Sequence, residues 1–88
     1  MAVKNTSRAV KSTGMNIIKK IEKHAHDIIG LKVNGNFYYM DNVMMHETGE
    51  FITLYAYQLD ENNCYIVYRF DEEELKRSEV ELYRLQKI

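Results

Sequence analysis

The sequence contains no proline, no tryptophan and a single cysteine, Cys64. One cysteine cannot form a disulfide within the chain, which excludes the disulfide-rich scaffolds of many small secreted proteins. We therefore expect a reducing compartment, the cytoplasm. No apolar run approaches the ~18–20 residues of a transmembrane helix, so we expect no contact with a membrane. Neither an apolar segment nor a cleavage site follows the basic residues 1–21, and we expect no targeting role for them.

Glycine is also scarce, and the four glycines stand apart, so there is no glycine-rich loop for phosphate groups. His24 and His26 are two residues apart and would point in different directions from a helix, which leaves no paired motif for a metal. Cys64 lacks a recognisable histidine partner, and we expect a small buried side chain there rather than a nucleophile. We predict that the protein is not an enzyme and binds neither metal nor cofactor.

Length and composition indicate one folded domain that spans residues 1–88. A chain of this length buries only about 60–65% of its unfolded surface, enough for one core. Seven tyrosines and three phenylalanines are too many packing groups for a disordered chain. Charge is uneven, because residues 1–35 carry seven lysines and arginines against two acids, whereas residues 36–88 carry five against eleven acids. Such a split is typical of a basic helix packed on an acidic sheet, or of two binding faces of opposite sign.

The apolar residues of the segment 15–29 recur at helical spacing. One arc of a helical wheel contains Ile17, Ile18, Ile21, Ala25, Ile28 and Ile29. Lysines lie opposite this arc, which predicts an amphipathic helix with a basic face. Gly30 then stands where a left-handed residue would end the helix. Two starts fit the pattern, one near Thr13 and a longer one near Thr6, so we predict a basic helical segment within residues 1–29.

From residue 30 onward the apolar period changes to two, which is typical of strands. The pair Asn34-Gly35 predicts a two-residue hairpin turn with positive φ at both positions. We expect a bulge at 41–42 and further turns at 48–49 and 60–63. The expected strands are 31–33, 37–46, 50–58 and 64–70.

The last segment predicts a one-turn helix and a closing strand. Asp71, with Glu74 three residues later, forms the pattern of a capping box and predicts a helix over 72–77. Residues 79–86 fit either a strand or a continuation of that helix, and we favour the strand.

These elements make an α+β fold. An N-terminal amphipathic helix is followed, over residues 30–88, by a small antiparallel sheet or an SH3/Sm-like barrel of about five strands, with a one-turn helix before the last strand. The order of elements resembles that of small SH3-like and Sm-like barrels, in which a short helical turn precedes the closing strand. This resemblance concerns element order alone and implies no function.

The expected sheet carries more tyrosine and methionine than one small core requires. Tyrosines that fall on neighbouring strands are Tyr38, Tyr55, Tyr57, Tyr65 and Tyr68. Tyrosine and methionine are enriched at the centres of protein interfaces, and carboxylates can meet a basic partner. Our first hypothesis is therefore a non-enzymatic protein-interaction domain that binds a protein partner and self-associates as a homo-oligomer. The candidate partner-binding residues are Tyr38, Met40, Met44, Tyr55, Tyr57, Glu72 and Glu73.

The abundant lysine, asparagine, isoleucine and tyrosine are all encoded by A/T-rich codons. This composition is typical of low-GC bacteria and of their phages and plasmids. It favours an accessory regulator or inhibitor of a phage or mobile element that binds a host protein.

Two alternatives remain open. A nucleic-acid-binding barrel would stack bases on the tyrosines of the sheet and hold phosphates with Arg8, Lys11, Lys19, Lys20 and Lys23. The net negative charge of residues 36–88 argues against it, because it would repel a phosphate backbone. A small-ligand-binding domain would use a pocket between the helix and the sheet.

Overall fold

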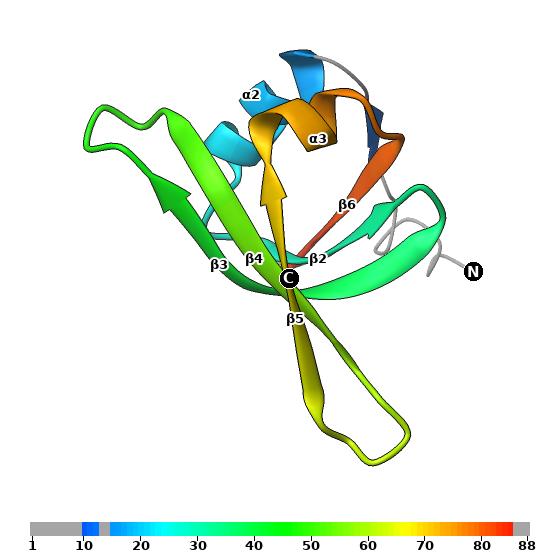
Figure 1. Ribbon diagram of the computed structural model, residues 1–88. Helices are drawn as coiled ribbons and strands as arrows, with labels where there is room; N and C mark the ends of the chain where they lie inside the picture. Colours follow the sequence, from blue (N-terminus) through cyan, green and yellow to red (C-terminus); the bar gives the residue numbers. More distant parts are fainter. Residues whose placement is uncertain (1–9, 13–14, 86–88) are drawn as a thin grey trace.

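The computed structural model of the protein describes residues 10–12 and 15–85, which form a small α+β domain (Figure 1). Its elements in chain order are β1 (Val10–Ser12), α2 (Met15–Lys23), β2 (Ile28–Val33), β3 (Asn36–Met45), β4 (Phe51–Leu59), β5 (Tyr65–Asp71), α3 (Glu72–Lys76) and β6 (Val80–Arg84). The strands form one antiparallel sheet in the order β1-β6-β2-β3-β4-β5. The short helix before the last strand is as predicted. In these two stretches of chain, no helix is long and apolar enough to cross a membrane.

The hydrophobic core lies between the two helices and one face of the sheet, which we call the inner face. α2 and α3 contact each other, and the β4–β5 hairpin projects away from them (Figure 1). The largest fully buried side chains come from both helices and from three strands: Ile17, Ile21, Leu31, Leu54, Leu75, Val80 and Leu82. Burial of one such aliphatic side chain stabilises a fold by roughly 1.5–3 kcal/mol, so the helices are held mainly by this contact.

The hairpin between β2 and β3 forms where the sequence predicted it. Asn34 and Gly35 have φ values of 50° and 89°, and the strands on either side pair from Val33 and Asn36 onward. Glycine and asparagine enter this backbone region at the least steric strain, so these two residues determine the turn.

A β-bulge interrupts β3 at the predicted place, since the pairing with β4 shifts between Met40 and Asn42. The predicted turns at 48–49 and 60–63 connect β3 to β4 and β4 to β5. The last segment is a strand, because β6 lies within residues 79–86.

The N-terminal helix is shorter than predicted. α2 ends at Lys23, and Ile28 and Ile29, which we assigned to the helix, belong to β2. A helix that begins near Thr6 is also wrong for residues 10–12, because these form β1. The isoleucines fit both the helical period and the strand period of the sequence. β2 pairs with β3 on one side and with β6 on the other, and this pairing favours an extended backbone at these β-branched residues.

Gly30 does not end a helix but lies inside β2, paired with Tyr39 of β3 and Tyr83 of β6. A Cβ atom placed on Gly30 would lie 2.6 Å from Cζ of Phe37, closer than real Cβ contacts allow. The ring of Phe37 therefore lies over the backbone of β2 and reaches Tyr83, with 5.5 Å between ring centroids. Glycine is required here by the close approach of a ring rather than by a helix end.

α3 begins after Asp71 as predicted, but the predicted capping box does not form. Asp71 has the extended backbone of an N-cap residue, yet its side chain makes no capping hydrogen bond. Its carboxylate instead accepts a hydrogen bond from Thr53 Oγ1 at 3.0 Å and pairs with Arg69 at 3.3 Å. The acids at 72–74 still favour a helix start through the helix dipole.

The contact between Gly30 and Phe37 gives a first prediction. Gly30→Ala should lower the free energy of unfolding by about 1–3 kcal/mol, because the new methyl group overlaps the ring. In a Phe37→Ala background the same substitution should cost at least about 1 kcal/mol less, since the overlap with the ring is gone. Urea denaturation of the four chains of this double-mutant cycle measures both values. Equal costs of Gly30→Ala in the two backgrounds would contradict the proposed contact.

Candidate functional site

Five aromatic side chains form a continuous row across the sheet, which we call the aromatic stripe. Its members in spatial order are Tyr83 of β6, Phe37 and Tyr39 of β3, Tyr57 of β4 and Tyr65 of β5. Phe37 meets Tyr83 and Tyr39 edge-on, with ring centroids 5.5 and 5.1 Å apart. Tyr57 stacks between Tyr39 at 5.3 Å and Tyr65 at 4.6 Å.

Strand alternation explains why the stripe lies on the outer face, opposite the core. Tyr38 packs against the core, so its neighbours Phe37 and Tyr39 point the other way. Phe37, Tyr39 and Tyr65 remain 37%, 47% and 65% exposed. Cross-strand aromatic pairs stabilise a sheet by roughly 0.2–1 kcal/mol each, which accounts for the contacts between the rings. Pair stabilisation does not account for the large ring area that stays in contact with water. Exposed apolar patches of this kind mark interaction sites.

Most charges around the stripe are paired, with the carboxylate of Asp41 near Tyr57 as an acid for which no ion pair is found among the described residues. Lys32 of β2 lies opposite Glu81 of β6, and Arg69 of β5 forms an ion pair with Asp71 at 3.3 Å. Most acids of residues 36–88 lie elsewhere, in two hairpin turns and at the start of α3: Glu47, Glu50, Asp60, Glu61, Glu72, Glu73 and Glu74. The outer face is therefore not the acidic surface that the net charge of this region suggested.

Tyr57 is the ring with neighbours on both of its faces. Its partial burial raises its pKa above the ordinary value, and the phenols of Tyr65 and Tyr39 and the carboxylate of Asp41 raise this pKa further. Each of these influences favours the neutral phenol over the phenolate. The centre of the stripe thus stays uncharged at neutral pH.

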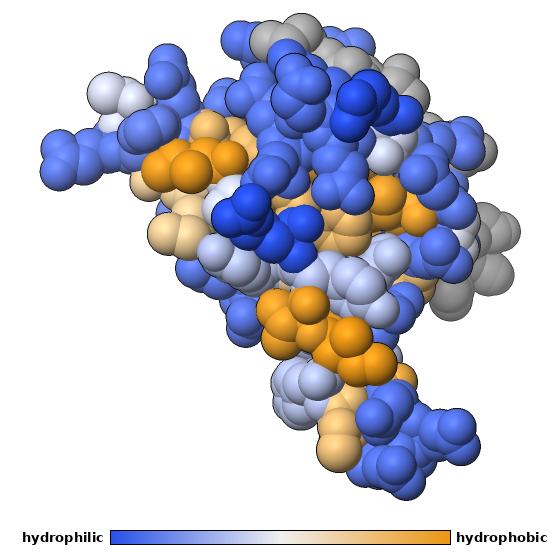
Figure 2. Space-filling view, viewed as in Figure 1, coloured by the Kyte–Doolittle hydropathy of each residue, from blue (hydrophilic) through white to orange (hydrophobic). Residues whose placement is uncertain are grey.

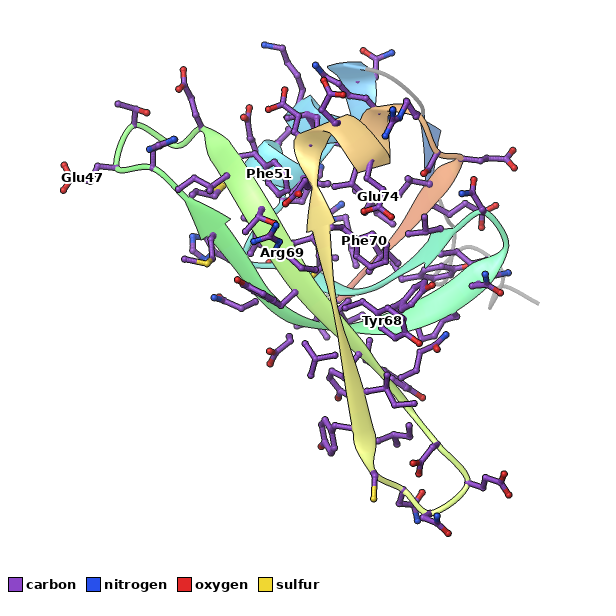
Figure 3. All side chains as sticks on the ribbon, in the orientation of Figure 1. Glu47, Phe51, Tyr68, Arg69, Phe70 and Glu74 are labelled. Carbon is purple, nitrogen blue, oxygen red and sulfur yellow. The ribbon has the colours of Figure 1, made fainter. Side chains whose placement is uncertain are left out.

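A second aromatic cluster lies on the inner face and belongs to the core. Tyr38 contacts Tyr68 and Phe70, each with 5.0 Å between ring centroids. Figure 3 shows Tyr68 and Phe70 on one side of β5 and Arg69 on the other. Burial raises the pKa of Tyr38, and Tyr68 and the carboxylate of Glu74 raise it further.

The structure does not gather the predicted partner-binding residues on one surface. They lie on the outer face of β4 (Tyr55, Tyr57), on the inner face of β3 against the core (Tyr38, Met40), and at the end of β3 and the start of α3 (Met44, Glu72, Glu73). Sequence reasoning missed Phe37, Tyr39 and Tyr83. The sequence did show that Phe37 and Tyr39 lie on one face of their strand. Which rings they meet on neighbouring strands depends on the strand register beyond a bulge, and no local sequence pattern determines that register.

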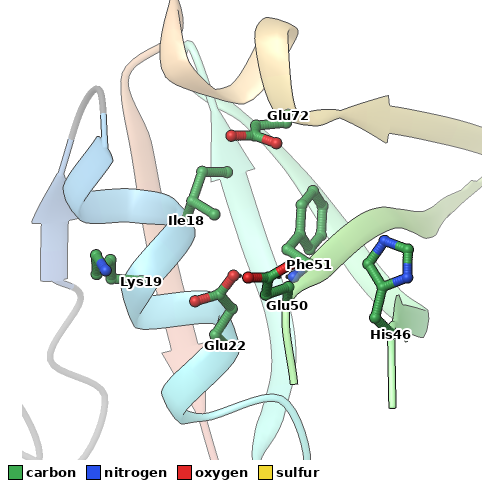
Figure 4. A pocket seen from close by; sticks show the side chains of 7 residues that line it. All are labelled: Ile18, Lys19, Glu22, His46, Glu50, Phe51 and Glu72. Atoms are coloured by element: carbon green, nitrogen blue, oxygen red, sulfur yellow. Dashed lines mark hydrogen bonds between the residues drawn. The ribbon is translucent and has the colours of Figure 1, made fainter. Parts of the chain in front are cut away.

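A cavity of about 390 Å³ opens between α2, the β3–β4 hairpin and α3 (Figure 4). Its lining residues are Ile18, Lys19, Glu22, His46, Glu50, Phe51 and Glu72. The carboxylate of Glu22 accepts a hydrogen bond from the Phe51 N–H at 2.9 Å, and Glu72 pairs with Lys76 at 3.2 Å. The carboxylate of Glu22 connects α2 to β4, and that of Glu72 stabilises α3 from within, so both carboxylates have a structural explanation. The hypothesis of a small ligand between helix and sheet refers to this place and stays a prediction.

A smaller, basic cavity of about 220 Å³ lies between the end of α2 and β6. It is lined by Lys20, Lys23, His24, Leu82 and Arg84. Arg84 also pairs with Asp27 at 3.3 Å, which partly offsets the positive charge. Burial lowers the pKa of His24, and the charges of Arg84 and Lys23 lower it further. The cavity therefore concentrates positive charge, as an anion-binding site requires.

The predicted phosphate-binding residues are divided between several places. Lys20 and Lys23 come together in the basic cavity, whereas Lys19 lines the larger cavity. Lys11 belongs to β1, and Arg8 lies outside the described residues.

Cys64 is exposed, contrary to our expectation of a buried side chain. It follows Asn63, whose φ of 62° closes the β4–β5 turn, and its N–H donates to the carboxylate of Asp60 at 2.9 Å. The cysteine is therefore held at the end of the hairpin, away from the core. Across residues 10–12 and 15–85, no group of three histidine, cysteine or acidic residues could hold a metal ion.

No family model, curated protein or solved structure matches this chain. Its function has to be inferred from its own residues.

The raised pKa of Tyr57 gives a second prediction. In a pH titration followed by the ¹³Cζ resonances of tyrosine, Tyr57 should lose its proton above the ordinary value of 10.0, and Tyr65→Phe should lower that midpoint. The folded protein keeps this proton longer than the unfolded chain, so the free energy of unfolding should fall as the pH rises above about 10. A midpoint for Tyr57 at or below 10.0 would contradict the desolvation of its phenol by the neighbouring rings.

Proposed function

We propose that this protein is a non-enzymatic protein-interaction domain that binds a partner protein with the aromatic stripe. One observation carries the proposal: five rings lie in unbroken contact on the outer face, three of them exposed and two half-buried, and most charges near them are paired. The centres of protein interfaces are enriched in aromatic residues and depleted of unpaired charge. Because the rings already hold one another in place, they lose little side-chain entropy when a partner covers them.

The mutual stacking of the rings favours a protein partner over stacked bases. Tyr57 has a ring against each of its faces, so a base could stack there only after Tyr39 or Tyr65 moved away. The stripe instead offers ring edges and phenol hydroxyls, which suit a partner with apolar side chains and hydrogen-bonding groups. Base-stacking platforms need free ring faces beside unpaired cations.

The wider context of the proposal comes from composition and fold. The A/T-rich codon usage supports a regulator or inhibitor from a phage or mobile element that acts on a host protein, and the single cysteine supports a cytoplasmic location. The one-turn helix before β6 supports the SH3/Sm-like barrel architecture. Buried Ile17 and Ile21 beside exposed Lys19 and Lys23 support an amphipathic α2.

Replacement of two stripe residues should strongly weaken partner binding. Tyr39→Ser/Tyr57→Ser should weaken binding of a partner captured from a bacterial lysate by roughly 30-fold or more, because buried tyrosines at interface centres contribute about 2 kcal/mol or more. Circular dichroism and a urea titration check that the variant is folded. The matched control is Glu72→Gln/Glu73→Gln, which should keep the partner. If the control loses the partner and the tyrosine variant keeps it, the stripe is not the binding surface.

The basic cavity favours nucleic-acid binding as a second candidate. This cavity is surrounded by Lys20, Lys23, His24 and Arg84. The cations in it repel one another, and a bound phosphate group would attract them instead. This surface is separate from the stripe's stacked rings, so it would bind backbone phosphates rather than read bases.

Fluorescence anisotropy with single- and double-stranded oligonucleotides tests this candidate. Lys20→Ala/Lys23→Ala should reduce the slope of log affinity against log salt by about 2, one unit for each lysine that no longer meets a phosphate. Lys76→Ala/Arg77→Ala removes the same charge from the last residue of α3 and its C-cap and should leave the slope unchanged. Absence of salt-sensitive binding tighter than about micromolar would rule out nucleic-acid binding.

A further inference from the structure

β5 forms one edge of the sheet, since the strand order ends there. In an antiparallel pair, alternate residues direct their backbone groups to the neighbouring strand and the residues between direct them away. Asp60 N–H donates to the carbonyl of Cys64 at 3.0 Å, which fixes the alternation in the β4–β5 hairpin. Counted from this pair, the β5 residues that bond to β4 are Ile66, Tyr68 and Phe70. Before Asp71, which ends the strand and stands at the N-cap of α3, the β5 residues whose N–H and C=O groups point to the open edge are Tyr65, Val67 and Arg69.

The side chains along this edge are apolar on both faces of the strand. Tyr65, Ile66 and Val67 are 65%, 42% and 57% exposed. Figure 2 shows hydrophobic side chains gathered on the projecting hairpin, between the body of the domain and the hydrophilic turn. Natural edge strands are protected by charged side chains, above all lysine, or by proline, a bulge or short length, and the charged residues of β5 are Arg69 and the terminal Asp71, which pair with each other. An edge with this composition favours pairing with another strand.

We propose that β5 of a second copy of this chain pairs antiparallel with this edge, around a two-fold axis that passes beside Val67. Each Val67 then lies opposite the partner's Val67, and Tyr65 lies opposite the partner's Arg69. All three edge residues exchange backbone hydrogen bonds, two for each pair. On the other face of the strand, Ile66 lies opposite the partner's Tyr68.

The edge is self-complementary in this register, and among axes at Ile66, Val67 and Tyr68 only the axis at Val67 sets Arg69 directly opposite the partner's Tyr65. The guanidinium of Arg69 meets the ring of the partner's Tyr65, a favourable cation–π contact. An axis at Arg69 would instead place two guanidinium groups opposite each other. An axis at Tyr65 would pair Val67 with Asn63 of the turn, whose positive φ of 62° cannot continue a strand. This match is the reason to assign a second copy as the occupant.

The same register brings like charges together at its two ends. The turn acids Asp60 and Glu61 of one copy approach the start of the partner's α3, where Asp71 and Glu72 stand. Salt screens such repulsion between exposed groups. Dimerisation should therefore be weak at low ionic strength and should strengthen as salt is added.

The dimer leaves the outer face accessible, and it stands whether or not the aromatic stripe binds another protein. Because Tyr65 ends the stripe on β5, the pairing would place the stripes of the two copies end to end across the two-fold axis. A dimer would then present one extended aromatic surface.

Cysteine cross-linking tests the register directly. In a Cys64→Ser background, Val67→Cys places two cysteines opposite each other, with Cα atoms about 5.5 Å apart, inside the disulfide range. Arg69→Cys, on the same face, lies four residues from its own counterpart, about 13 Å away. Under mild oxidation the Val67→Cys chain should form disulfide dimers at least about ten times faster than the Arg69→Cys chain. Equal rates, or a faster Arg69→Cys chain, would overturn the proposal.

Sedimentation equilibrium of the unlinked chain gives a second measurement. Wild type should dimerise with rising concentration and salt, Val67→Thr should retain this behaviour, and Val67→Lys should abolish it by opposing two charges at the axis. Circular dichroism confirms that each variant is folded. A wild type that stays monomeric at every concentration, or a Val67→Lys chain that dimerises like wild type, would overturn the dimer and leave the proposed partner binding by the stripe untouched.

Discussion

Two helices of nine and five residues cannot cover both faces of a six-stranded sheet. They cover the inner face, where Ile17, Ile21 and Leu75 are fully buried, and this contact supplies the single core of the domain. Both protein contacts proposed for the molecule, at the aromatic stripe and at β5, follow from what remains uncovered. In the part of the chain that the structure describes, the outer face carries the aromatic stripe without a covering layer, and β5 projects beyond the helices with an open edge (Figure 1).

On the outer face, contacts between the aromatic rings shield part of each ring from water. Phe37 can lie over β2 only because residue 30 has no side chain, and from there it connects Tyr83 on β6 to Tyr39 on β3. Stacking of Tyr57 and Tyr65 continues the contact to the edge strand. A row of separate aromatic side chains would be mobile in water, whereas this row is already arranged. Preorganisation of this kind increases affinity by reducing the entropy lost on binding, which is why the stripe is a better binding surface than its exposed area alone indicates.

The sequence predicted those parts of the fold that depend on neighbours in the chain. The pair Asn34-Gly35 determines its turn by backbone sterics alone, and the bulge and the β4–β5 turn were also found from local composition. The helix end was wrong because Ile28 and Ile29 satisfy both periods, and the choice is made by strands that come later in the chain. The stripe was only partly predicted for the same reason. Tyr57 meets Tyr39 through a register that passes a bulge, and the role of Gly30 depends on a ring seven residues away.

The two edges of the sheet differ in a way that bears on how the protein avoids uncontrolled aggregation. One edge is β1, a three-residue strand too short to serve as a template for further strands. The other is β5, with seven residues, β-branched and aromatic side chains, and acids placed only at its ends. Those acids, in the turn at 60–61 and in α3 at 72–74, also approach one another in the proposed dimer, so they weaken pairing at this edge when the ionic strength is low. A single antiparallel copy centred on Val67 satisfies the edge and closes it, because a two-fold contact uses the same surface on both partners and leaves none for a third.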